Sequence, residues 1–496
     1  MDTSSGLPRA LARFVARGIG EVRVVCGSVR SDGEGAEMLA HRLNRRDGLA
    51  VGVMLFSMFF GAGNLILAPL LGVQAAGSTP LALAGFIVSA VGLPVLTIAA
   101  IALSGSVRQL ADRISPLFSE VFAALVYLAI GPFLAIPRTA TTSYEMLRPL
   151  LPTDLSPTAA LLVFSLAFFA VAYVLAMHPS RLTELMGKAS GPALLLLIVL
   201  VVGAVLVSPP GGPASAAAGD YAARPLVAGF VCGYQTMDVL AALAFGIVIA
   251  MNVREKGLED TRDVARQVMR SGAIAGVLMM LIYCGFGYLG YTMGSVVPGV
   301  GNGAEVIAAA ARIEFGSLGA VLVAAIFGLA CLNVCIGLTC SISEYFSERY
   351  ARLGYRQWAL AVVVVSFLLS NVGLTAILGY SVPLLLALYP VAICLVAMGL
   401  LQGRVGRSGV GRSDAGNAGA RVGDARDAPA WRLAVALCAL DSVTVALRDG
   451  YAPTLWLPFD MLPLADLHMG WITLAVLGLV VGRLWRCARS GEGGVQ

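Results

Sequence analysis

The chain has 496 residues, of which 58% are hydrophobic and only 13% are charged. A soluble globular protein carries about 25% charged residues, so the composition excludes a soluble enzyme and predicts an all-α integral membrane protein. The net charge of +5 needs no nucleic-acid partner, because the arginines and lysines concentrate in segments expected on one side of the membrane.

Stretches of about 20 apolar residues predict about twelve transmembrane helices. Their expected ranges are 48–72, 80–104, 117–139, 158–177, 184–208, 226–251, 270–292, 316–343, 357–375, 378–401, 431–447 and 470–487. The division between the ninth and tenth spans, around Ser370 and Asn371, stays open. The distribution of basic residues predicts that both termini are cytoplasmic.

The first ten spans form an expected core over residues 48–402. A basic extension, 1–47, precedes the core, and its composition leaves open an interfacial helix or a disordered tail. The Gly/Ala/Arg/Asp-rich segment 403–430 predicts a flexible cytoplasmic linker. Two accessory helices within 431–487 and a cytoplasmic tail, 488–496, complete the expected organisation.

Two of the spans are interrupted by residues that disfavour a helix. The first contains FFGAGNLILAPLLG, residues 59–72, and the sixth contains VCGYQTMDVLAALAFG, residues 231–246. Interrupted spans in corresponding positions of two inverted halves are typical of the binding site of a secondary transporter with a five-plus-five repeat. The sequence contains no phosphate loop and no cluster with metal-ligand spacing, which disfavours ATP-driven transport and a membrane enzyme.

The interruptions suit a zwitterion, because an opened helix exposes backbone N–H groups to an anion and carbonyls to a cation. Close helix packing is the alternative reason for the glycines. The candidate substrate-binding residues are Gly61, Ala62, Gly63 and Asn64 in the first span and Gly233, Tyr234, Gln235, Thr236 and Asp238 in the sixth. An ionisable Asp238 at mid-depth predicts either a ligand-binding or proton-coupling group or a structural acceptor for the broken helix.

The third and eighth spans carry further candidates. Pro132 and Pro137 predict a kink in the third span. Arg138, expected near its outer end, is interpreted as an outer gate or a partner of Glu145, or else as an arginine that reaches interfacial water. In the eighth span Thr339, Ser341 and Ser343 offer oxygen ligands for sodium, although such hydroxyls often bond to carbonyls of their own helix.

Six stretches together resemble the bacterial branched-chain amino acid:cation symporters, the BrnQ-type carriers of the amino acid–polyamine–cation superfamily. They are FFGAGNLILAPLLG, VGLPVLT, GPFLAIPRTATTSYE, GYQTMDVLAALAFGIVI, ACLNVCIGLTCSISEYF and SVPLLLALYP. The resemblance runs from about Asp47 to the last helix. It implies a LeuT-type fold with discontinuous helices 1 and 6 and two accessory C-terminal helices, in the bacterial cytoplasmic membrane.

The resemblance also implies import of leucine, isoleucine and valine by symport with sodium or protons. Carried over, the carbonyls of Ser57 and Phe60 and the hydroxyl of Thr339 would surround sodium. The second hydroxyl position is Cys340 in this sequence, a departure that Ser341 or Ser343 would have to compensate.

The expected partners are an amino acid and the lipid bilayer, with no obligate protein partner, no organic cofactor and no catalysis. The alternatives are a carrier of another small neutral amino acid or related solute, and a non-transporting receptor.

Overall fold

The computed structural model describes residues 43–151, 156–258, 260–408, 424–452, 454–463 and 465–492. Within these ranges the chain is helical and contains no strand. Most of the basic extension, the centre of the linker and the end of the tail lie outside the described residues.

Each predicted span coincides with one helix or with consecutive helical segments. They are α2 (Arg45–Phe59) and α3 (Ala62–Ala75); α4 (Thr79–Ile87) and α5 (Leu93–Ser104); α7 (Pro116–Leu128) and α8 (Ala135–Leu147); α9 (Pro157–Ala176); η6 (Thr183–Ser190) and α10 (Gly191–Val207); α12 (Pro225–Tyr234) and α13 (Asp238–Arg254); α14 (Thr261–Met293); α16 (Ser317–Arg349); α17 (Tyr355–Ser370); α18 (Leu374–Ser408); α19 (Asp424–Tyr451); and α20 (Gly470–Glu492). The boundary between α17 and α18 therefore falls at Ser370, where the sequence left the division open.

Eight continuous helical stretches of the described residues are long and apolar enough to cross a membrane, or nine if the bent pair α12 and α13 counts as one span; one of the eight, Ala62–Ser104, comprises α3, α4 and α5. A criterion of length misses spans that are short or interrupted, such as α2, α17 and α20. The sequence did not predict three shorter helices between the spans, α6 (Val107–Ala111), α11 (Asp220–Ala223) and α15 (Gly303–Phe315). They are shorter than the roughly 20 residues that a membrane helix needs.

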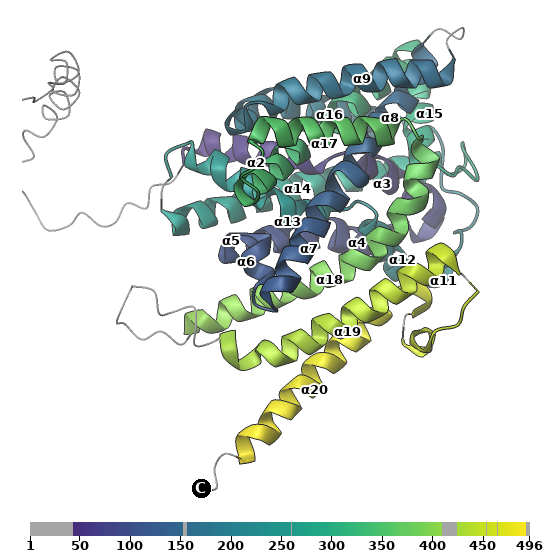
Figure 1. The fold of residues 1–496 in the computed structure, drawn as a ribbon. Helices are drawn as coiled ribbons and strands as arrows, with labels where there is room; N and C mark the ends of the chain where they lie inside the picture. Colours follow the sequence, from purple (N-terminus) through teal and green to yellow (C-terminus); the bar gives the residue numbers. More distant parts are fainter. Residues whose placement is uncertain are drawn as a thin grey trace, which may run out of the picture. The chain divides into compact units, whose positions relative to one another are not determined.

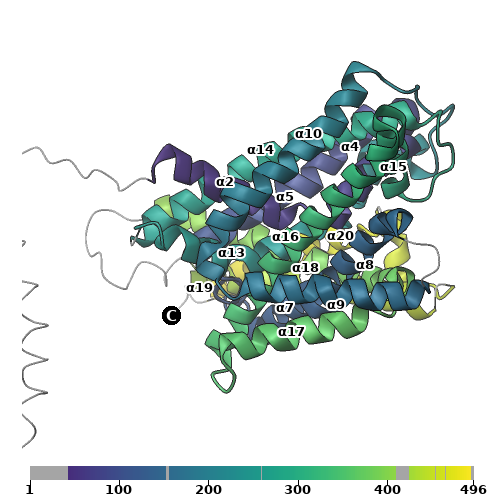
Figure 2. The same ribbon diagram turned by 90° about the horizontal axis from the view of Figure 1, so that it is seen from above.

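The helices of the core pack in two groups (Figure 1). The α3 group consists of α3, α4, α5, α12 and α14, in which α4 packs on α12 and α14 packs on α3 and α5. The α16 group consists of α8, α9, α16 and α17, which contact one another. Figure 2 shows α9 and α17 beside each other along one flank and α4, α10 and α14 toward the other. The helices α2 and α13 contact members of both groups.

Two glycines allow very close packing within the α3 group. A Cβ atom on Gly229 of α12 would lie 1.9 Å from the Ala82 carbonyl oxygen of α4, and one on Gly290 of α14 would lie 2.0 Å from the Pro69 carbonyl oxygen of α3. Only a residue without a side chain lets the two backbones approach this far, as is common where helices associate in lipid.

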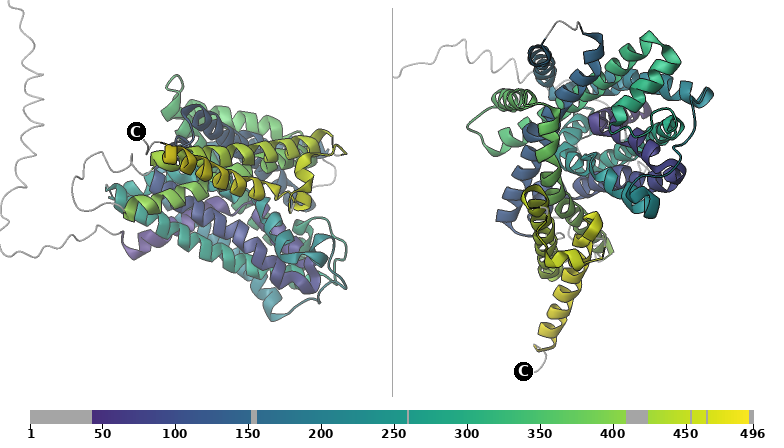
Figure 3. Two further views of the ribbon diagram at one scale, coloured as in Figure 1. Left: turned by 90° about the horizontal axis from the view of Figure 1, so that it is seen from below. Right: turned by 90° about the vertical axis from the view of Figure 1, so that its right-hand side faces the viewer.

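The accessory helices pack on each other and on the end of the core. Helix α19 lies along both α18 and α20, and Figure 3 shows this C-terminal pair along one side of the bundle. Within the segment predicted as a linker, 403–430, α18 continues to Ser408 and α19 begins at Asp424. Arginine and alanine in these flanks favour helix, and an acidic residue in the first turn suits the helix dipole.

Candidate functional site

The first interruption lies between α2 and α3 and is shorter than the sequence predicts. Only Phe60 and Gly61 are non-helical, while Ala62, Gly63 and Asn64 form the first turn of α3. The side chain of Asn64 explains the early start of α3, because its Oδ1 atom accepts a hydrogen bond of 3.1 Å from the Gly61 N–H.

Several backbone groups at this interruption have no backbone hydrogen-bond partner, as expected of an opened helix. In the described part of the chain no backbone carbonyl accepts from the N–H groups of Ala62, Gly63 or Asn64. Equally, no backbone N–H there donates to the carbonyls of Ser57 or Phe60. The start of α3 thus offers donors and the end of α2 offers acceptors, on the two sides of one break.

The second interruption separates α12 from α13, which meet at an angle of 42°. Met237 has a left-handed backbone conformation with φ of 66°, and Asp238 is the first residue of α13. The Thr236 hydroxyl donates to the Gly233 carbonyl at 2.8 Å. From α18, the Tyr389 hydroxyl accepts a bond of 3.4 Å from the N–H of Val239, so the new helix start is supported by a neighbouring helix.

Asn64 and Asp238 connect the two interruptions directly. The Asn64 amide donates to Asp238 Oδ2 at 2.7 Å and to the Tyr283 hydroxyl of α14 at 2.6 Å. Tyr283 in turn donates to Asp238 Oδ2 at 3.4 Å. All three side chains are buried, Asp238 with 1% of its surface exposed. Asp238 thus accepts hydrogen bonds that connect the two broken helices, while its role as a ligand-binding or proton-coupling group stays a prediction.

A third interruption divides the predicted third span. Gly131 has non-helical angles (φ −88°, ψ −115°) beside Pro132, and the backbone becomes regular again at Ala135. The kink therefore lies where the prolines predict it. Pro137 belongs to the first turn of α8, where a missing backbone N–H is tolerated. Arg138 follows it, one turn from the break.

The three interruptions surround one small cavity of about 40 Å³. Its lining includes Gly61 to Asn64 of the first break, Thr236 to Asp238 of the second, and Arg138 of the third. From α16 it is lined by Val334 and Leu338. The structure thus brings the candidate substrate-binding residues of the first span together with Thr236 and Asp238 of the sixth. The other three candidates, Gly233, Tyr234 and Gln235, are not among the residues that line this cavity.

The predicted cation ligands differ in their contacts. The Ser341 hydroxyl donates to the Gly337 carbonyl at 2.9 Å and the Ser343 hydroxyl donates to the Thr339 carbonyl at 2.6 Å. Both hydroxyls thus bond to their own helix, as membrane serines often do. The thiol of Cys340 lies 3.6 Å from the Ala176 carbonyl of α9. The buried hydroxyl of Thr339, in contrast, has no hydrogen-bond partner among the described residues.

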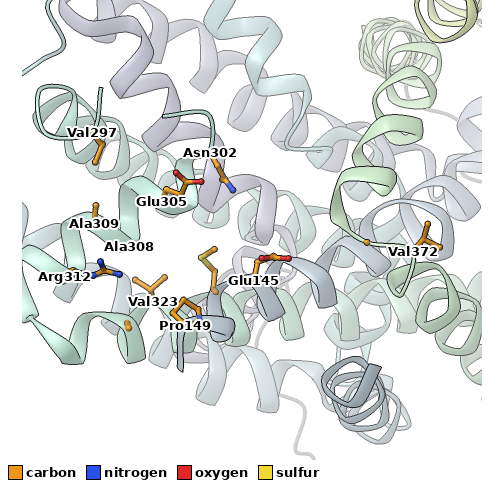
Figure 4. A pocket seen from close by; sticks show the side chains of 13 residues that line it. Glu145, Pro149, Val297, Asn302, Glu305, Ala308, Ala309, Arg312, Val323 and Val372 are labelled. Carbon is orange, nitrogen blue, oxygen red and sulfur yellow. The ribbon is translucent and has the colours of Figure 1, made fainter. Parts of the chain in front are cut away.

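A second and much larger cavity, of about 1130 Å³, lies at the end of the bundle that holds α15. Figure 4 shows Glu145 on one side of this cavity and Asn302, Glu305 and Arg312 on another. Arg138 is not part of its lining, and no Arg138–Glu145 ion pair occurs within the described residues. The two side chains are seven residues apart on one helix, or about 10 Å along its axis, and face different cavities.

The fold has counterparts among solved structures. The TM-score is 0.55 with Mhp1, a nucleobase-cation-symport-1 family transporter, at 15% sequence identity, over 89% of this chain and 93% of that one. It is 0.51 with MhsT in complex with L-phenylalanine, at 13% identity, over 83% of this chain and 99% of that one. These likenesses show the fold, which is the LeuT-type transporter fold with interrupted helices 1 and 6 that the sequence predicts.

The sequence comparisons identify the family. The model of the branched-chain amino acid transport protein family matches residues 44–412. The branched-chain amino acid transport system 3 carrier protein of Pseudomonas aeruginosa is 40% identical over 363 residues, which are 73% of this chain and 82% of that carrier. The branched-chain amino acid permease BrnQ of Escherichia coli K12 is 34% identical over 449 residues, 90% of this chain and 97% of that permease.

The chain therefore belongs to the branched-chain amino acid transport protein family. It is a multi-pass membrane transporter for amino acids and not an enzyme, since its relatives are permeases and carriers. The family resemblance read from the sequence motifs is confirmed.

Proposed function

We propose that this protein imports leucine, isoleucine and valine by symport with a cation, sodium or a proton, through alternating access. The observation that carries the proposal is the Asn64–Asp238 hydrogen bond of 2.7 Å, which joins two helix interruptions around one cavity. A site with free donors on one side of a break and free carbonyls on the other suits a zwitterion and a cation together.

The substrate's carboxylate is placed at the start of α3, where the N–H groups of Ala62, Gly63 and Asn64 have no backbone acceptor. Its apolar side chain suits the aliphatic part of the same lining, which includes Ile130, Val334 and Leu338. At about 40 Å³ the cavity has room for water molecules but not for leucine, since an engineered cavity that accepts benzene measures about 150 Å³. Binding is therefore expected to separate the surrounding helices.

The cation is placed between the end of α2 and α16. The free carbonyls of Ser57 and Phe60 and the unpartnered hydroxyl of Thr339 are oxygen atoms of the kind that sodium prefers. A buried hydroxyl without a partner is unfavourable by about 1–3 kcal/mol, which an ion in contact with it would remove. Cys340 is not assigned to the site, since its thiol faces Ala176.

The proposed orientation of the protein in the membrane is based on the distribution of its basic residues. Loops with an excess of arginine and lysine usually face the cytoplasm, which supports a topology in a bacterial cytoplasmic membrane with both termini in the cytoplasm and the end with α15 on the outer side. The large cavity lined by Glu145 and Glu305 then opens toward the exterior and is the proposed entrance for the substrate.

The test is uptake of labelled leucine into proteoliposomes under an imposed sodium gradient, a proton gradient or neither. Concentrative uptake under one of the two gradients is expected, with isoleucine and valine as competitors. Equilibration without accumulation under every gradient would contradict symport. Accumulation of another small neutral amino acid in preference to leucine would favour the alternative carrier, and binding without uptake would favour a receptor.

A further inference from the structure

Arg138 places a cation in the centre of the protein without a close ion pair among the described residues, and the carboxylate that acts on it from the same cavity is Asp238. The Arg138 side chain lines the cavity between the three interruptions. In the described part of the chain neither an ion pair nor a side-chain hydrogen bond includes its guanidinium group. A charged group at membrane depth is unfavourable unless it is paired or solvated, so this position calls for a partner.

The position of Arg138 in its helix gives no structural reason for an arginine there. Arg138 lies in the first turn of α8, where the helix dipole favours acidic residues and opposes basic ones. It does not reach interfacial water along the helix either, because its guanidinium lies beside the first interruption. A Cβ atom on Gly63 would come within 2.3 Å of Arg138 Nη2, so the guanidinium occupies the space beside the Gly63 backbone.

Asp238 lies on the same cavity but is already bonded. Its Oδ2 atom accepts from Asn64 at 2.7 Å and from Tyr283 at 3.4 Å, while no described ion pair joins it to Arg138. The cavity therefore holds one carboxylate that already accepts hydrogen bonds and one guanidinium that donates to no acceptor among the described hydrogen bonds. This guanidinium lies beside Gly63 at the start of α3, where no described backbone carbonyl accepts from the N–H groups of Ala62, Gly63 or Asn64.

We propose that the Arg138 guanidinium binds the carboxylate of the transported amino acid, together with the N–H groups at the start of α3. Guanidinium and carboxylate form paired, charge-assisted hydrogen bonds, and the helix start adds donors of the same polarity. Arg138 is thus the residue that selects solutes with a free carboxylate over the corresponding amines and alcohols. This inference rests on the proposed import of amino acids and identifies the group that recognises them.

The inference can be tested by ligand binding to the purified full-length protein, measured by calorimetry with leucine and with leucinol, in which CH₂OH replaces the carboxylate. Wild type is expected to bind leucine at least about 30-fold more tightly than leucinol, since removing one partner of a buried charge pair weakens binding by about 2 kcal/mol or more. In Arg138→Gln the leucine affinity is expected to fall by a similar factor, with the leucinol affinity unchanged.

Two other variants allow the inference to be tested even if the Arg138→Gln protein does not fold. Arg138→Lys keeps the charge and is expected to retain part of the preference for leucine. Gly63→Ala, whose new methyl group would displace the guanidinium, is expected to lose the preference although Arg138 is present. Arg148→Gln, at an exposed arginine just beyond the end of α8, is the matched control and is expected to bind both ligands as wild type does.

The outcomes separate the inference from the proposed function. Equal losses for leucine and leucinol in Arg138→Gln would show that Arg138 supports the fold or balances Asp238, and would overturn the inference. Wild type that binds both ligands equally well would overturn it too, while leaving amino acid transport intact. Wild type that binds neither leucine nor another amino acid would instead contradict the proposed function.

Discussion

Gly187 in η6 lies directly against Ala50 in α2, so that a Cβ atom on Gly187 would come within 2.2 Å of the Ala50 carbonyl oxygen. This contact fixes the first half of the interrupted helix 1 on the segment that precedes α10. Close by, the Thr183 hydroxyl donates to Met54 Sδ at 3.3 Å.

Gly187→Ala is therefore expected to destabilise the protein by about 1–3 kcal/mol, because the new methyl group must move α2 or η6. The measurement is thermal unfolding of the purified protein. Gly203→Ala is the control, since a Cβ atom on Gly203 of the adjoining α10 meets nothing within 4 Å. If the two variants unfolded at the same temperature, the close contact would not contribute to stability.

Asp238→Ala is expected to reduce leucine uptake to background and to lower stability by about 2–3 kcal/mol, because it removes the charged acceptor of two buried donors. Tyr283→Phe removes one of these donors and also the hydroxyl that accepts from Asn64, and it is expected to lower stability by about 1–2 kcal/mol. Uptake and thermal unfolding measure the two effects. Tyr288→Phe on the same helix is the control, because Tyr288 is 36% exposed. Equal effects at positions 283 and 288 would contradict the role of the hydrogen-bonded group.

Thr339→Val is expected to abolish stimulation by the coupling cation while leaving stability unchanged within about 1 kcal/mol, since the hydroxyl that it removes has no partner. Cys340→Ala is expected to keep the stimulation, because the thiol lies against Ala176. The measurement is the dependence of uptake on cation concentration for both variants. If Thr339→Val kept the stimulation by the cation, or if Cys340→Ala lost it, the proposed position of the cation site would be contradicted.

Four charged residues join the start of α2, the segment η6 and the loop after α13. Lys256 lies 3.6 Å from both Asp47 and Glu184, and Lys188 lies 2.8 Å from Glu184. Lys256→Glu is expected to destabilise the protein by no more than about 1 kcal/mol, because partly exposed ion pairs contribute little. The measured difference in thermal unfolding should shrink at high salt. Combining Lys256→Glu with Asp47→Lys should restore only the part of the loss that comes from the pair of positions 47 and 256, because Glu184 and Lys188 then face like charges. No recovery at all would indicate that Lys256 acts through other contacts.

The sequence predicts the breaks of helices 1 and 6 well, because a Gly-x-Gly-Asn cluster and a mid-span aspartate are unusual in uninterrupted membrane helices. It does not predict their extent. Residues 62–64 are helical since Asn64 bonds to the Gly61 N–H, a contact that depends on the exact path of the backbone.

Arg138 and Tyr283 illustrate what the sequence does not show. Counting residues along an unbroken third span places Arg138 near the outer end, whereas the break at Gly131 brings it to the central cavity. Tyr283 lies in an ordinary apolar span, and its role depends on Asn64 and Asp238, which are far away in the sequence. A buried tyrosine carries no local pattern that distinguishes these bonds from simple packing.

The close approach of α4 to α12 and of α3 to α14 bears on how the protein moves. Backbones in direct contact cannot slide without losing their packing, and Asn64, Asp238 and Tyr283 bond α13 to the same body. Arg138 and Thr339 belong to the α16 group instead. The two proposed ligand sites are thus divided between two bodies, so any relative rotation of these bodies would change the distances that define both proposed sites at once. A cation and an amino acid that bridge the same boundary would then favour the same closed arrangement, which is sufficient for each to strengthen the binding of the other.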